Sequence, residues 1–291
     1  MSDDLSPAHD VLPFGRAPRP DTGPALAERL REVMTRNLGP HASGLDRVRI
    51  DAATVPGSPD VQSLDVDVTG LVVRAMGAAD APDPAENVEH VVGREKAVAR
   101  TIRAQGHPVT VAGVAVDLDA EIRDLRFSWV EGADGSLSIE ESGQSTEHPV
   151  SGHLRAAASR DALVTTVREL ATKALADQGF TLTALDVDLA SRGPRAASIV
   201  ASAKIRKGFL SASAQITATA EIDQAMVLTL SNIGATSRNP VVAALLLAVR
   251  GKLEQVDGKR IDLASSLPPG VTLSDVRLDV GEQLVLSVRV G

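Results

Sequence analysis

Cysteine is absent from this chain of 291 residues. Disulfide bonds, thiolate nucleophiles and cysteine-containing metal sites are therefore excluded. Aromatic residues are almost as scarce, at 2%, with four Phe, one Trp and no Tyr. Proteins commonly hold single-stranded nucleic acid by stacking its bases on aromatic rings, so this scarcity argues against a nucleic-acid partner. The net charge of −8 argues the same way, since it would repel a phosphate backbone.

Long apolar runs are also missing. The longest, residues 241–249, is far shorter than the roughly 20 residues that a membrane-spanning helix needs. Residues 1–23 are acidic and rich in proline, whereas a secretory signal joins a basic stretch to an apolar one. These features predict a cytoplasmic protein whose acidic surface permits only transient contact with a membrane.

Motifs for catalysis or cofactor binding are not found either. The sequence contains no G-x-S-x-G, no P-loop and no G-x-G-x-x-G, and no histidine pair has the spacing of metal ligands on a helix. Three aspartate pairs could place two carboxylates on one face of a strand: Asp65/Asp67, Asp117/Asp119 and Asp186/Asp188. They alternate with apolar residues, so a solvated strand face is the favoured explanation. We expect no enzyme activity, cofactor or metal site.

What the sequence does contain is 43% hydrophobic residues in patterns that predict both helices and strands. Helices are expected at 24–38, 94–104, 160–178 and 240–256, and alternating strands between them. This order predicts an α+β fold in which long, highly curved antiparallel sheets wrap around long amphipathic helices. Residues 1–23 are expected to form a flexible arm, and residues 24–150 and 151–291 two α+β halves packed as one elongated unit.

Two strands change the parity of their apolar residues partway along. The alternation of Leu64, Val66 and Val68 shifts after Gly70, where a glycine is typical of a bulge. A second shift separates Ile122 from Leu125. The glycine at the first shift therefore predicts a bulge.

Residues 209–222 alternate almost perfectly, and their apolar side is rich in alanine. At about 3.3 Å per residue such a strand would run roughly 45 Å, which implies a long twisted sheet. The small side chains allow two interpretations. Either a helix packs closely on them and the core is solid, or they leave an elongated apolar space suited to an acyl chain.

Two segments resemble the LmeA-like phospholipid-binding proteins of actinobacteria, which have a tubular lipid-binding (TULIP-like) fold. Residues 44–73, GLDRVRIDAATVPGSPDVQSLDVDVTGLVV, are similar to their paired strands, and residues 258–291 to their closing Leu-Pro-Pro-Gly turn and terminal strands. The resemblance implies a lipid-binding protein that holds acyl chains in an elongated apolar cavity and acts as a lipid carrier. The alternative is a structural or protein-interaction module with a solid core.

The candidate lipid-binding residues lie on the expected inward faces of helices and strands, or form candidate wall and rim positions. They are Leu26, Leu30, Val33, Phe127, Trp129, Leu170, Leu175, Phe209, Ala214, Ile216, Ala218, Leu245 and Val249.

Overall fold

The computed structural model describes residues 11–74, 90–142, 149–176, 179–207, 210–237, 258, 260–262 and 272–291. Strands make up 64% and helices 17% of these residues. The α-helices among them are α1 (Gly23–Leu38) and α2 (Arg160–Ala176), with short 3-10 turns at η1 (Gly39–His41) and η2 (Leu45–Arg47). The strands form two sheets, which we call sheet A and sheet B.

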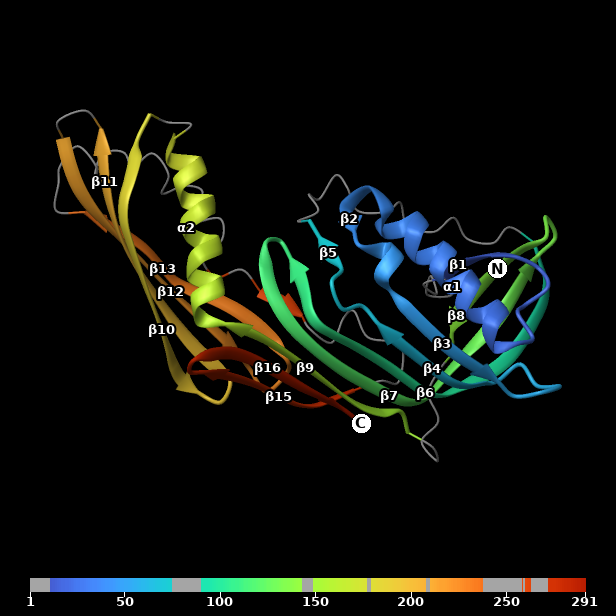
Figure 1. Cartoon of the computed structure of the whole chain (residues 1–291). Helices are drawn as coiled ribbons and strands as arrows, with labels where there is room; N and C mark the ends of the chain where they lie inside the picture. The colour runs from blue at the N-terminus through green and yellow to red at the C-terminus, as the bar shows by residue number, and fades with distance from the viewer. Residues whose placement is uncertain are drawn as a thin grey trace, which may run out of the picture.

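Sheet A has 11 strands in the described residues, and its main path runs β15-β16-β9-β7-β6-β4-β3. Its strands are β1 (Val11–Arg16), β2 (Ala42–Ser43), β3 (Arg49–Thr54), β4 (Val61–Asp67), β5 (Val72–Val73), β6 (Val91–Val111), β7 (Val114–Gly132), β8 (Ser136–Glu141), β9 (Ser151–Ser159), β15 (Leu273–Val280) and β16 (Gln283–Val290). The sheet is curved, and α1 packs over β3 on one side of it (Figure 1).

Sheet B has five strands in the order β10-β11-β12-β13-β14. They are β10 (Thr181–Gly193), β11 (Ala196–Lys207), β12 (Leu210–Ile222), β13 (Val227–Ser237) and β14 (Arg260–Asp262). Helix α2 lies beside β10, and the red β15–β16 hairpin passes close to the end of sheet B (Figure 1). Sheet A therefore contains strands from both sides of the boundary expected near residue 150.

The expected α+β fold, with sheets wrapped around long amphipathic helices, is wrong: the described structure is mostly β, and its two helices are short. The helix predicted at 94–104 lies inside β6, which pairs with β7 from Val91 to Val111. Helix-forming residues such as Ala97 and Arg100 follow the strand there, because pairing along a whole neighbouring strand outweighs local propensity. The helix predicted at 240–256 lies outside the described residues.

Several local predictions are confirmed. Helix α1 has proline at its first turn and ends before Gly39, and α2 begins at Arg160 as expected. The parity change between Ile122 and Leu125 coincides with Asp124, which has a φ of 58°, in the left-handed region. The bulge predicted at Gly70 is not found: β4 ends at Asp67, and Gly70, with a φ of 81°, lies in the turn that leads to β5.

One buried core surrounds the aromatic residues of the N-terminal half. Phe14 is fully buried and lies edge-to-face with Trp129, with ring centroids 5.3 Å apart, and Phe127 lies 5.2 Å from the same ring. Phe14 belongs to β1, which pairs with β8. Residues 11–16, expected to belong to a flexible arm, thus contribute a strand and a core side chain.

Replacing Phe14 with alanine should lower the free energy of unfolding by about 3–5 kcal/mol, since it removes a fully buried ring. Urea denaturation measures this loss. Leu12→Ala is the matched control on the same strand, because Leu12 is 45% exposed and should lose only about 0.5 kcal/mol. Equal and small losses in the two variants would show that β1 does not contribute to the core.

Candidate functional site

The outer face of sheet A carries a row of charged residues at matching register positions. Each member pairs with the next across neighbouring strands from β3 to β15. We call them the charged row: Asp51, Asp65, Arg103, Glu121, His153, Arg289 and Asp275. The Asp65/Asp67 pair noted in the sequence lies on this face.

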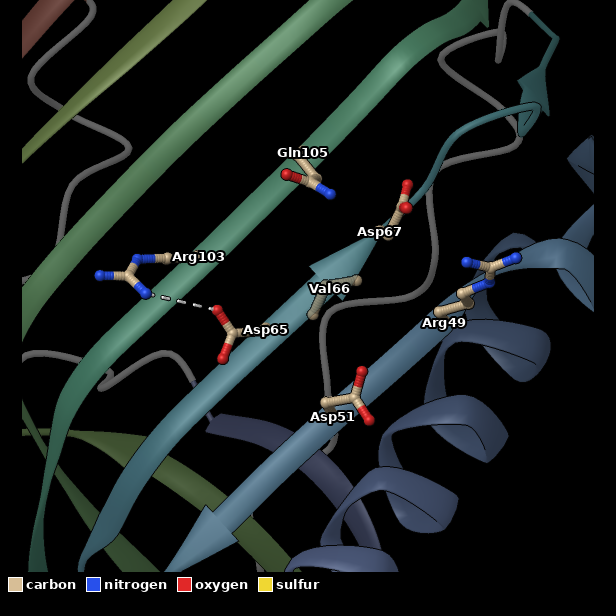
Figure 2. A pocket seen from close by; sticks show the side chains of 7 residues that line it. All are labelled: Arg49, Asp51, Asp65, Val66, Asp67, Arg103 and Gln105. Atoms are coloured by element: carbon tan, nitrogen blue, oxygen red, sulfur yellow. Dashed lines mark ion pairs between the residues drawn. The ribbon is translucent and has the colours of Figure 1, made fainter.

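A shallow cavity of about 230 Å³ opens where the charged row crosses β3, β4 and β6. Figure 2 shows Asp51, Asp65 and Asp67 around it, with Arg49 and Arg103 among them. The Arg103 guanidinium lies 3.8 Å from Asp65 and 2.9 Å from Glu121. The opposite charges in the cavity thus lie next to one another.

Hydrogen bonds lower the pKa values of two carboxylates on this face, Asp67 and Glu121. The Thr69 side chain and backbone N–H lower the pKa of Asp67, the backbone bond measuring 2.9 Å. The bond from Arg103, helped by Arg123, lowers the pKa of Glu121. Among the described residues, no group of three or more His, Asp or Glu side chains could hold a metal ion. This arrangement fits the solvated strand face that the sequence favoured.

The inner face of sheet A carries a second row, offset by one residue along each strand and entirely apolar. We call it the apolar row: Ile50, Val66, Ala104, Ala120, Leu154, Val288 and Val276. Its two ends are buried, Ile50 in a cluster that includes Ala27 of α1, and Val276 in a cluster with Ile222 of sheet B. The members between them are half-buried.

The apolar face of sheet B continues from that second cluster. Ile222 and Leu228 of sheet B meet Leu286 and Val288 of β16 there. Farther along the same face, the pairing register aligns Val187, Ala201, Ile216 and Ala235 in one row across β10, β11, β12 and β13. Val187 is 8% exposed, whereas Ile216 is 42% exposed. The face is therefore covered at β10 and open at β12.

Small side chains dominate the open part of this face. Ala201 and Ala203 of β11 oppose Ile216 and Ala214 of β12, and Ile199, 37% exposed, opposes Ala218. Such side chains protrude little from the sheet beside α2, which contacts β10. The residues named here offer apolar contact to a molecule lying on them, and none of them is a nucleophile or a titrating group.

Comparison with protein-family models, curated proteins and solved structures finds no match to this chain. The resemblance of residues 44–73 and 258–291 to LmeA-like proteins therefore stays a prediction.

The structure separates the candidate lipid-binding residues into groups. Leu26, Val33, Phe127 and Trp129 belong to one buried cluster, with Leu30 packed against it. Leu175 is half-buried on α2, and the side chain of Leu170 lies outside the described part of that helix. Ala214, Ile216 and Ala218 share the apolar face of β12. The positions outside the described residues are Phe209, Leu245 and Val249.

Sequence reasoning missed the inner-face residues of sheet A. Leu154 and Val288 were not among the candidates, although each lies in a strand with alternating polarity. Alternation identifies the apolar side of one strand, but only the pairing of β9 with β7 and β16 aligns these side chains into a row.

The ion pairs of the charged row predict a pH-dependent contribution to stability. Glu121 has a lowered pKa in the fold, so its contribution is fully present above its usual pKa of about 4.3 and is lost as the pH falls through the lowered value. Glu121→Gln should therefore lower the urea midpoint at about pH 7, and the difference from the wild type should shrink at about pH 2.5.

Glu131→Gln is the control for this prediction. Glu131 is exposed on the same strand and forms no ion pair with another described residue. Its replacement should leave the midpoint nearly unchanged at both pH values. A Glu121→Gln deficit of the same size at both pH values would contradict the assignment to ion pairing.

Proposed function

We propose that this protein binds an acyl chain on the connected apolar faces of sheets A and B and acts as a lipid carrier. The observation that carries the proposal is the cross-strand row from Val187 to Ile216, which passes from covered to open across sheet B. Exposed apolar surface of this kind, continuous with a core, is typical of ligand-binding and interaction sites.

The shape of the face favours a thin, flexible ligand. Ala201, Ala214 and Ala218 rise little above the backbone, so an extended hydrocarbon chain can contact several strands at once. At about 0.8 kcal/mol per methylene removed from water, a twelve-carbon chain would gain at most about 9 kcal/mol before the cost of its immobilisation. Before that cost is subtracted, half of this burial would correspond to a dissociation constant near the millimolar range, so a measurable affinity requires most of the chain to be buried.

The contrast between the two halves locates the proposed site. The cluster of Phe14, Phe127 and Trp129 is filled by its own side chains, which favours a structural role for that region. The face containing Ile199 and Ile216 remains exposed in the folded chain. The LmeA-like resemblance of residues 44–73 and 258–291 points to the same class of ligand. The proposal therefore rests on sheet B and the neighbouring strands of sheet A.

Replacing Ile216 with aspartate should weaken binding of dodecanoate at least about 10-fold, because an acyl chain lying there would desolvate a charge. Isothermal titration measures the affinity, and thermal unfolding checks that the fold is kept. Gln215→Asp places the same charge on the opposite face of β12 and should bind like the wild type.

Two results would overturn the proposal. One is the absence of measurable binding of dodecanoate or dodecanol to the wild-type protein, which would favour the alternative of an interaction module. The other is equal weakening by Ile216→Asp and Gln215→Asp, which would mean that the apolar face is not the site.

A further inference from the structure

A cleft of about 430 Å³ lies between α2 and β10, beside the covered end of the apolar face of sheet B. This volume falls within the range of roughly 300–1,000 Å³ that is usual for small-molecule sites. Its lining combines apolar and polar side chains: Arg168, Thr172, Leu182, Thr183, Ala184 and Leu185. The acyl-chain site proposed above does not include this cleft.

Among the described residues that line the cleft, Arg168 is the only charged one. Its Nη2 donates a hydrogen bond to the carbonyl oxygen of Leu185 at 3.0 Å, which fixes the guanidinium against β10. No described carboxylate lies within ion-pair distance of it. Arg160, on the same helix, differs because it lies 2.8 Å from Asp188. Within the described part of the chain, the cleft therefore presents a held cation that no neighbouring acid neutralises.

The chemistry of this cation selects an oxyanion. A guanidinium has five N–H donors, so one bond to Leu185 leaves others to meet the paired oxygens of a carboxylate or phosphate. Thr172 and Thr183 use their hydroxyl protons on backbone carbonyls, of Arg168 and Lys204 respectively. Their oxygens can accept hydrogen bonds but compete little with Arg168 as donors.

The cleft and the apolar face share one residue, Leu185. Leu185 lines the cleft and pairs with Ala203, which in turn pairs with Ala214 on the open part of the face. A single ligand could thus place its head group against Arg168 and its hydrocarbon chain along this row. On the basis of the proposed function, we propose that Arg168 binds the terminal oxyanion, a carboxylate or a phosphate monoester, of a single-chain amphiphile.

The test compares three ligands of equal chain length: dodecanoate, dodecyl phosphate and dodecanol. Wild-type protein should bind at least one of the two anions about 10-fold more tightly than the alcohol, and which anion is favoured identifies the head group. Arg168→Gln should abolish that preference by weakening the anion about 10-fold, while leaving the affinity for dodecanol unchanged. Unchanged alcohol binding also shows that the face beside α2 is intact.

Lys173→Gln is the matched control, because it removes one positive charge from an exposed position on α2 that does not line the cleft. It should bind all three ligands like the wild type. Equal affinity of the wild type for dodecanol and both anions would overturn the role of Arg168 and leave acyl-chain binding standing. Equal weakening of the anions by Arg168→Gln and Lys173→Gln would overturn it as well. Failure of all three ligands to bind would overturn both proposals.

Discussion

The register between neighbouring strands is the constraint on which the rest of the structure depends. In sheet A, one set of paired positions aligns seven charged or titratable residues from Asp51 to Asp275, and the adjacent set aligns seven apolar residues from Ile50 to Val276. Because successive side chains of a strand point to opposite faces, a slip of one residue in any strand would place a charge in the apolar row. The cost of moving a charged or titratable side chain into that row disfavours such a slip.

The long hairpin of β6 and β7 contacts both the N-terminal aromatic cluster and helix α2. Near its open end it holds the aromatic cluster through Phe127 and Trp129. At its turn, Gly113 accepts a hydrogen bond of 3.0 Å from the Thr166 hydroxyl of α2. The same two strands thus contact the well-filled N-terminal core and position the helix that borders the proposed ligand face. Helix α1 and sheet B cover the two ends of the apolar row and leave its centre half-buried.

Much of the local structure could be predicted from the sequence because it depends on neighbouring residues. Proline near the start of α1 and the parity change at Asp124 are local signals, and both are found where expected. The fold class could not be predicted in the same way. Ala97 and Ala99 favour a helix by propensity, yet pairing with Phe127 and Leu125, respectively 30 and 26 residues farther along the chain, places them in a strand.

Some residues of the candidate site could likewise be predicted from local sequence patterns, and others could not. Alternation within β12 correctly marks Ala214, Ile216 and Ala218 as one face, because that pattern is local. Leu154 and Val288 join the apolar surface only through pairing of β9 with β16, strands that are far apart in the sequence. Arg168 carries no sequence signal at all, since an arginine on a helix is ordinarily a solvated residue.

The contact between α2 and β10 links the stability of sheet B to its proposed function. Among the described strands, β10 lies at one edge of sheet B, and an edge strand with unpaired backbone groups can pair with another chain. Here Arg160 and Arg168 donate to the carbonyls of Val187 and Leu185, so part of that edge is occupied by side chains of the same protein. The apolar face beside it remains open at Ile199 and Ile216. A strand of another chain would find part of the β10 edge already occupied, whereas an apolar ligand can still contact the exposed side chains of the face. The proposed ligand is therefore a flexible apolar molecule rather than an added strand.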